Sequence, residues 1–214
     1  MGVQGKNQAV IAGGLWKTFQ RYGFLGMLRL LRDIIFSKCI SPNVRLIRYP
    51  YYFRGKSFIQ FGKGFTSGVG LRLDAFGSDS NQIVFGKNIE LGDYVHIGAL
   101  SSITIGDNVL MASKIYITDH DHGVYQGSGE FTSSPTQIQS QKTLNISPVS
   151  IGNNVWLGEN VCVLKGVHIG ENSIIGASSV VTKSIPPNVI AVGAPARVVK
   201  RYDFAAKEWV NCDA

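Results

Sequence analysis

The sequence predicts an all-β protein built as a solenoid of stacked coils, and three observations point to that fold class. Residues 151–186 fall into an unbroken series of six-residue units, which read IGNNVW, LGENVC, VLKGVH, IGENSI, IGASSV and VTKSIP. Glycine is frequent, at 25 of 214 residues, whereas charged residues make up only 16% of the chain. Many tight turns between short extended segments account for this composition better than long charged helices do.

The six-residue period predicts a coil with three flat faces. An aliphatic residue opens every unit, and glycine follows it in four of the six; the opening residues are Ile151, Leu157, Val163, Ile169, Ile175 and Val181. We expect these aliphatic side chains to point into the coil and the glycines to help the chain around its corners. Successive coils then pair as parallel strands about 4.8 Å apart. The same rhythm occurs earlier, over residues 85–102 and 105–122.

The repeat divides the chain into three regions. Residues 59–195 form the predicted solenoid, and within it the rhythm breaks at residues 123–148, a polar segment that we interpret as an excursion loop from one corner. Residues 1–58 form an N-terminal helical and lead-in region. Residues 196–214 are predicted to close the solenoid with a short C-terminal helix, because a solenoid needs an end cap.

Residues 16–40 of the N-terminal region have the apolar spacing of a helix, which Gly23 and Gly26 weaken in its first half. One face of this helix is apolar and arginines lie beside it; the apolar residues are Phe24, Leu28, Leu31 and Ile35. We expect this face to pack on the solenoid. The alternative is peripheral contact with an anionic membrane surface, which suits a basic amphipathic helix.

Composition argues against several other classes of protein. The first residues lack the features of a signal peptide and no 18-residue apolar stretch occurs, so we expect neither secretion nor membrane spanning. Cys39, Cys162 and Cys212 match neither a disulfide framework nor a zinc-ligand pattern, which favours a cytoplasmic protein. The net charge of +7 suits an anionic partner, but we find no nucleic-acid-binding motif and expect no nucleic-acid partner.

The stretch ITDHDHG, Ile117–Gly123, concentrates two of the four histidines and two aspartates where the excursion loop departs. Together with IGNNVWLGENV and IGASSVVTKSIPPNVIAVGAPARVV, it resembles the hexapeptide-repeat acetyltransferases, in particular the galactoside, maltose and polysaccharide O-acetylating enzymes. The resemblance covers residues 59–200, and the segment RLIRYPYYFRGKSFIQFGKGF is similar to the lead-in of bacterial polysaccharide O-acetyltransferases. It implies a left-handed parallel β-helix and a homotrimer with active sites between subunits.

The resemblance also implies an activity. Enzymes of this family transfer an acetyl group from acetyl-CoA directly to a hydroxyl or amine, with a histidine as general base. The matching position here is His120, and His122 is the second choice. Asp119 or Asp121 would orient the imidazole, and His96 and Trp156 would line the acceptor pocket. The implied acceptor is the sugar hydroxyl of a bacterial surface polysaccharide or its precursor.

The same resemblance assigns residues to the acetyl-CoA site. It implies no metal ion. Small residues let the pantetheine arm lie along the coils, and basic residues meet the phosphates of CoA. The assigned residues are Trp156, Gly158, Gly176, Ala177, Thr182, Lys183, Arg197 and Lys200.

Other functions remain open on the sequence. On the same fold, an N-acetyltransferase of amino sugars or a drug-acetylating enzyme is an alternative to the O-acetyltransferase. A zinc enzyme like the γ-class carbonic anhydrases could take ligands from His96, His120 and His122. A non-catalytic trimeric scaffold would use the repeat for assembly alone.

Overall fold

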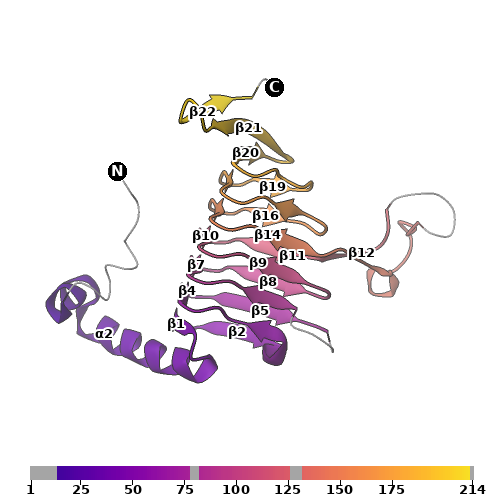
Figure 1. Cartoon of the computed structure of the whole chain (residues 1–214). Helices are drawn as coiled ribbons and strands as arrows, with labels where there is room; N and C mark the ends of the chain where they lie inside the picture. The colour runs from indigo at the N-terminus through magenta and orange to yellow at the C-terminus, as the bar shows by residue number, and fades with distance from the viewer. Residues whose placement is uncertain (1–13, 78–81, 126–131, 213–214) are drawn as a thin grey trace.

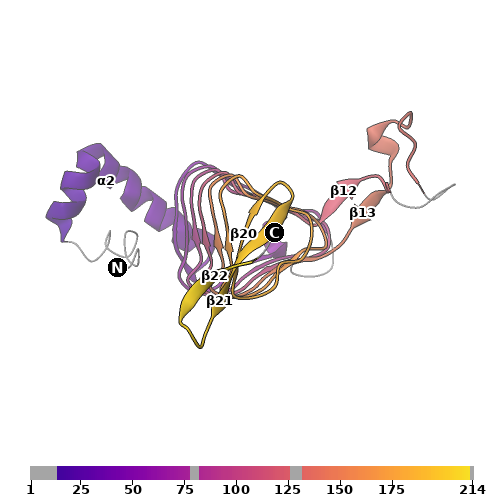
Figure 2. The same cartoon turned by 90° about the horizontal axis from the view of Figure 1, so that it is seen from above.

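A computed structural model describes residues 14–77, 82–125 and 132–212, and its strands stack as the successive coils of a solenoid (Figure 1). Seen along its axis, the solenoid has a three-sided outline (Figure 2). Its sides are three mainly parallel sheets, here called faces A, B and C, which the chain visits in that order in each coil. The predicted all-β fold of stacked parallel coils is therefore confirmed.

The strands of each face follow the order of the coils. Face A contains β1 (Val44–Ile47), β4 (Phe65–Ser67), β7 (Glu90–Leu91), β10 (Leu110–Met111), β15 (Trp156–Leu157), β18 (Ile174–Ile175), β20 (Val189–Gly193), β21 (Ala196–Asp203) and β22 (Glu208–Asn211). Face B contains β2 (Tyr51–Arg54), β5 (Leu71–Ala75), β8 (His96–Ala99), β11 (Tyr116–Thr118), β16 (Cys162–Val163) and β19 (Val180–Val181). Face C contains β3 (Ile59–Gln60), β6 (Ile83–Phe85), β9 (Ile103–Ile105), β14 (Val149–Ile151) and β17 (His168–Ile169). Within the described residues, the single turns of 3-10 helix η1 (Lys56–Phe58) and η3 (Gln139–Gln141) lie between strands.

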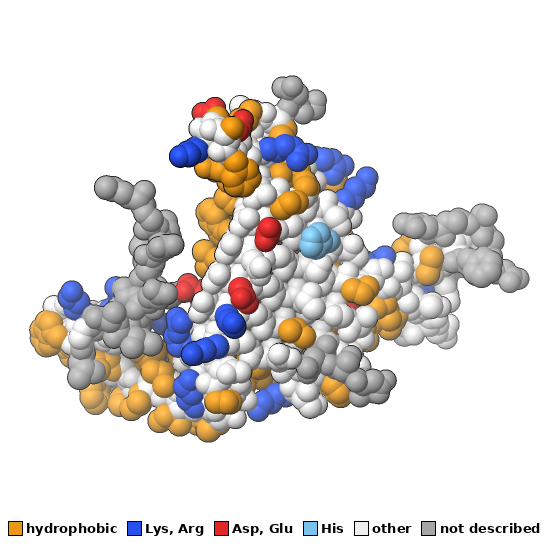
Figure 3. Space-filling model, viewed as in Figure 1, with side chains coloured by type: hydrophobic (Ala, Val, Ile, Leu, Met, Phe, Trp, Pro, Cys, Tyr) orange, Lys and Arg blue, Asp and Glu red, His pale blue; other side chains and the backbone are white. Residues whose placement is uncertain are grey.

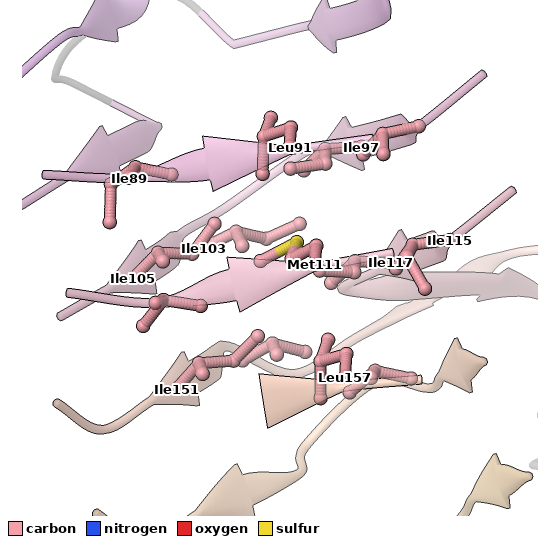
Figure 4. Packing of buried hydrophobic residues seen from close by; sticks show 14 of the residues in the cluster. Ile89, Leu91, Ile97, Ile103, Ile105, Met111, Ile115, Ile117, Ile151 and Leu157 are labelled. Atoms are coloured by element: carbon pink, nitrogen blue, oxygen red, sulfur yellow. The ribbon is translucent and has the colours of Figure 1, made fainter. Parts of the chain in front are cut away.

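Aliphatic side chains fill the interior of the coils, one above another (Figure 4). On face A, Leu91 pairs with Met111 and Met111 with Leu157, and all three are at most 5% exposed. The residues that open the six-residue units are buried as predicted. Burying one such side chain stabilises the fold by about 1.5–3 kcal/mol relative to leaving it in water.

Asparagine side chains form a hydrogen-bonded ladder along the corner between faces C and A. The amide of each residue donates to the next over 2.9–3.2 Å, through Asn88, Asn108, Asn154, Asn172 and Asn188. All five have φ between 55° and 60°, the left-handed conformation that asparagine tolerates better than most residues. The step from Asn108 to Asn154 spans 46 residues, against 18 from Asn154 to Asn172, because the excursion lies between them.

Helix α2 (Leu15–Ile40) projects sideways from the first coil (Figures 1 and 2). The helix is interrupted at Gly23, whose φ of 64° and ψ of 178° are not helical. Its C-terminal half is fixed to β1: Ser37 Oγ accepts a hydrogen bond of 2.7 Å from the backbone N–H of Ile47, and Lys38 Nζ donates one of 2.7 Å to the carbonyl of Val44. None of the helices among the described residues is long and apolar enough to cross a membrane.

The expectation that the apolar face of this helix packs on the solenoid is wrong. Phe24 is 66% exposed, Leu31 is 56% exposed and Ile35 is 54% exposed. The helix instead turns Asp33 and Ser37 inward, where both are buried. The polar anchor through Ser37 therefore decides the rotation of the helix and leaves its apolar stripe in solvent.

The predicted C-terminal helix is also wrong, because residues 196–211 form an antiparallel hairpin. Strand β21 pairs antiparallel with β20 and then with β22, so the hairpin continues face A beyond the last parallel strand. Tyr202 contacts Trp209 across the hairpin, with 5.2 Å between their ring centroids. Paired aromatic and β-branched side chains favour strands, and an open sheet edge was available to receive them.

Candidate active site

The histidine cluster lies at the corner where the chain would pass from face B to face C. After β11 the chain instead continues outward as β12 (His120–His122), which pairs antiparallel with β13 (Leu144–Ile146) on its way back. His120 is the first residue of this stem. The backbone N–H of Ser147 donates to the carbonyl of Asp119 over 2.8 Å and closes the base of the stem. The excursion thus begins at the histidine itself.

Asp119 is fully buried at the base of the stem, and N–H donors surround its carboxylate. The backbone N–H groups of Leu100, Ser101 and Ser102 donate to it over distances of 2.7–3.1 Å. The Nδ1 atom of His120 lies 2.9 Å from Oδ1 of the same carboxylate. Because a carboxylate accepts hydrogen bonds and does not donate them, Nδ1 of His120 carries the proton.

This tautomer leaves Nε2 of His120 as a hydrogen-bond acceptor. The side chain is 16% exposed. Thr118 Oγ1 donates to the carbonyl of His120 over 3.1 Å, and the ring of Phe76 meets the imidazole edge-on at 6.4 Å between centroids. A neutral imidazole held in one orientation, with its accepting nitrogen unoccupied by any described residue, can take a proton from a hydroxyl group.

The two other members of the cluster point elsewhere. Oδ2 of Asp121 lies 3.7 Å from Nζ of Lys165, one coil farther along the same corner. His122 is exposed, and its carbonyl accepts a hydrogen bond of 2.7 Å from the hydroxyl of Tyr125. Of the two aspartates that the sequence offered as partners for His120, the structure places Asp119 in contact with it and turns Asp121 toward the lysine.

His96 lies on the outer side of face B, one coil before the cluster. Its Nε2 atom is 3.1 Å from Oδ2 of Asp74, and its ring lies 5.3 Å from that of Tyr116. Burial lowers the pKa of His96 below its ordinary value; the hydrogen bond to Asp74 raises it, and the charge of Arg72 lowers it further. At neutral pH His96 is therefore an uncharged hydrogen-bonding group.

Gly98 lies between the two histidines. A Cβ atom on it would be 3.8 Å from Cε1 of His120 and 3.9 Å from Nε2 of His96, with no other side chain or backbone group as close. Gly98 is itself buried, and the two imidazole rings approach each other over this position.

The proposed donor-binding residues fall on two different sides of the solenoid. Trp156 is 48% exposed on the outer side of face A, in register with Ile174, Ile190 and then Lys200. Gly158, Gly176 and Ala177 follow at the corner between faces A and B, whereas Thr182 and Lys183 lie at the corner that carries His120, farther toward the C-terminal end. One subunit therefore does not bring Trp156 to His120.

Basic side chains gather around the C-terminal hairpin (Figure 3). Arg197 and Lys200 lie on β21, and the guanidinium of Arg197 donates to the carbonyl of Ala196 over 3.0 Å. Arg201 follows them on the same strand. These residues form a cationic rim at the end of the column that contains Trp156.

In the described part of the chain, no group of three or more His, Cys, Asp or Glu side chains is placed to hold a metal ion. His96 and His120 each use one ring nitrogen on an aspartate.

Sequence reasoning missed a polar cluster beside the candidate base. It consists of Arg54, Arg72 and Asp74, with Phe76 close to them directly after the end of β5. Arg72 and Asp74 are two residues apart in an alternating strand, a spacing that places both on the outer side. The sequence could therefore have predicted that Arg72 and Asp74 lie together. It could not have predicted the pairing of β2 with β5, which brings Arg54 to them.

Residues 148–183 match the family model described as bacterial transferase hexapeptide (six repeats). The chain is 48% identical over 193 residues to the putative lipopolysaccharide biosynthesis O-acetyl transferase WbbJ of Escherichia coli K12, covering 90% of this chain and 97% of that protein. It is 33% identical to the galactoside O-acetyltransferase of the same organism, covering 75% of this chain and 62% of the relative.

A solved structure shares the fold. It is AntD, an N-acyltransferase from Bacillus cereus, with a TM-score of 0.55 and 21% identity over 77% of this chain and 82% of that one. Because the likeness to WbbJ extends over nearly the whole of both chains, this chain belongs to the hexapeptide-repeat acetyltransferase family.

Proposed function

We propose that the protein is an acetyl-CoA-dependent O-acetyltransferase that acetylates a sugar hydroxyl of a bacterial surface polysaccharide or its precursor, with His120 as general base. The observation that carries the proposal is the buried contact between Asp119 and Nδ1 of His120, which fixes Nε2 as a proton acceptor at an open corner. The names of the two Escherichia coli relatives, a lipopolysaccharide and a galactoside O-acetyltransferase, support a sugar acceptor.

The proposed reaction is a direct transfer. Nε2 of His120 takes the proton of the acceptor hydroxyl while its oxygen attacks the thioester carbonyl of acetyl-CoA. The tetrahedral intermediate collapses, the carbon–sulfur bond breaks, and the departing thiolate takes the proton from the imidazolium. Asp119 holds the ring in the required tautomer and stabilises the imidazolium while it carries charge.

We assign the donor to the column on face A that runs from Trp156 to Lys200. Consecutive strands are about 4.8 Å apart, so the three steps of this column extend over about 14 Å along the solenoid. An extended pantetheine arm suits such a straight, partly apolar track, with the phosphates of CoA at Arg197 and Lys200. Gly158, Gly176, Ala177, Thr182 and Lys183 are the further residues we assign to this substrate.

In a homotrimer, the donor column of one subunit and His120 of the next subunit can form one site. His120 and Trp156 lie on different sides of one solenoid, so the thioester can reach the base if face A of one subunit faces the corner of the next. A three-sided body meets that condition in a closed ring of three copies. Size-exclusion chromatography with light scattering tests it: three subunits of 23.3 kDa amount to about 70 kDa, and a monomer would contradict this arrangement.

Calorimetric titration of CoA tests the proposed function without knowledge of the acceptor. We expect saturable binding near one site per subunit, and Lys200→Ala to weaken it by about 10-fold, because a charge-assisted contact to phosphate is lost. Lys87→Ala, which removes an exposed lysine from another corner, is the matched control. An unchanged dissociation constant in the Lys200 variant would contradict the phosphate role, and no CoA binding by the wild type would contradict the function.

We further propose that helix α2 makes a peripheral contact with a membrane. Its exposed apolar stripe is flanked by cations, and the one acidic residue, Asp33, is paired with Arg32 at 2.7 Å. This combination fits an anionic lipid surface. The free thiols of Cys39, Cys162 and Cys212 suit the cytoplasmic side of that membrane.

We expect the protein to sediment with phosphatidylglycerol vesicles and not with phosphatidylcholine vesicles, and the binding to weaken as salt is raised. Leu28→Glu should reduce the bound fraction at least about 10-fold, because a charge replaces an inserted apolar group. Ile138→Glu makes the same change at a 63% exposed site on the excursion loop and should have no effect. Equal binding to both lipids would contradict the anionic surface.

A further inference from the structure

The outer side of face B carries a cluster of cationic and aromatic residues below the candidate base. In register, Tyr52 of β2 lies beside Arg72 of β5, and Arg72 beside His96 of β8. The parallel column next to it contains Arg54, then Asp74, then Gly98. Both arginines are about half exposed, with side-chain exposures of 48% for Arg54 and 47% for Arg72.

The cluster has a net positive charge. Asp74 is buried, with 2% of its side chain exposed; its Oδ2 atom is 2.7 Å from Nε of Arg72, and its Oδ1 atom is 3.8 Å from Nε of Arg54. One carboxylate therefore faces two guanidinium groups. Burial and the charge of Arg72 lower the pKa of His96, so this residue adds no charge at neutral pH. One positive charge is left without a counter-charge inside the cluster.

The two guanidinium groups are held in place but keep free donors. Each lies 5.7 Å from the centroid of the Tyr52 ring, and Arg54 also lies 5.2 Å from the centroid of Phe76. Arg72 donates a hydrogen bond to Asp74 through Nε. The two terminal nitrogens of its guanidinium have no hydrogen-bond partner among the described residues. Fixed, outward-facing guanidinium donors are suited to bind phosphate oxygens in pairs.

The distance from this cluster to the base matches one sugar ring. Thr118, Gly98, Asp74 and Arg54 occupy the same register on successive strands, so the backbone of Arg54 lies about 10 Å from Gly98. The exposed ring of Phe76 links the cluster to the base: the guanidinium of Arg54 lies 5.2 Å from its centroid, and the His120 imidazole lies 6.4 Å from it. A pyranose bound over Phe76 would place one hydroxyl at His120 and a substituent on the opposite side of the ring at the guanidinium of Arg54.

We propose that Arg54 and Arg72 bind the diphosphate of the acceptor, which is a glycosyl diphosphate, either nucleotide-linked or lipid-linked. The inference rests on the proposed function, since it specifies the acceptor of the same site. Acetylation then precedes the step in which the glycosyl diphosphate donates its sugar, because that step releases the diphosphate that the arginines recognise.

The test is calorimetric titration of UDP and of geranyl diphosphate into the protein saturated with CoA, so that the phosphate site of the donor is filled. We expect binding of at least one probe, weakened about 10- to 100-fold by Arg72→Gln through loss of charge-assisted hydrogen bonds. Lys63→Gln removes the same charge from an exposed residue on another corner and should leave binding unchanged. Tighter binding of UDP supports a nucleotide-linked acceptor, and tighter binding of geranyl diphosphate supports a lipid-linked one.

Arg54→Gln keeps the short contact between Arg72 and Asp74, so it reports on the site even where Arg72→Gln unfolds the protein. Failure of both probes to bind a CoA-saturated protein overturns the inference and leaves the proposed function intact. If CoA itself does not bind, the proposed function fails, and the same two titrations without CoA still decide whether the cluster binds a diphosphate.

Discussion

Replacing His120 with alanine is expected to lower kcat by about 100-fold or more, because a positioned general base contributes about 10²- to 10⁴-fold to proton transfer. The side chain is partly exposed at a corner and makes no contribution to the apolar core, so the coils and their assembly should be unaffected. The rate is followed as release of the free thiol of CoA in the presence of a sugar acceptor, and the dissociation constant of CoA is measured alongside.

The control for this prediction lies in the same cluster. His122→Ala removes an exposed imidazole two residues away and should keep nearly full activity. If His120→Ala retains activity and His122→Ala loses it, the base is His122. If neither change affects the rate, deprotonation by a histidine of the cluster is not part of the reaction.

Replacing Asp119 with asparagine is expected to damage both catalysis and stability. The amide would turn an N–H₂ group toward the backbone N–H groups of Leu100, Ser101 and Ser102, or toward Nδ1 of His120, and either orientation leaves buried donors facing each other. Each unsatisfied buried group costs about 1–3 kcal/mol, and hydrogen bonds to a charged acceptor are worth about 1.5–3 kcal/mol. We expect the free energy of unfolding to fall by about 3 kcal/mol.

The loss of activity should exceed what unfolding explains. With an amide at position 119, His120 no longer has an ionised partner to hold its Nδ1 proton and to stabilise the imidazolium, so kcat should fall at least about 100-fold at temperatures where the variant remains folded. Asp121→Asn changes the same residue type on the side facing Lys165 and should spare both properties. Urea denaturation and initial rates at low temperature separate the two effects; full activity in folded Asp119→Asn would contradict its role.

The repeat allowed much of the fold to be predicted, since an aliphatic residue every six positions leaves few ways to bury a continuous core. The ends were harder. Helix α2 has the apolar spacing that predicted it. Its rotation about its own axis, however, is set by the buried hydrogen bond of Ser37, which an apolar pattern cannot reveal. The C-terminal residues were expected to cap the solenoid as a helix, but they pair with the open edge of face A and cap it as a hairpin.

The sequence placed the histidine cluster where the excursion departs, but it did not give the contacts of the cluster. The choice of His120 as the base rests on the family resemblance and stays a prediction. The two flanking aspartates are equivalent in sequence until backbone N–H groups from the preceding coil select Asp119. Arg72 and His96 are neighbours in space although 24 positions separate them, because the first coils are longer than the regular ones of 18 residues. A strict period therefore could not align them.

The asparagine ladder has a consequence for how such a protein can diversify. The hydrogen bond from Asn108 to Asn154 is as short, within 0.3 Å, as the bonds between later coils, although 46 residues rather than 18 lie between its partners. The solenoid therefore closes across the excursion as if that segment were not there. The excursion can therefore change in length or sequence between related proteins without disturbing the register of the coils on either side of it.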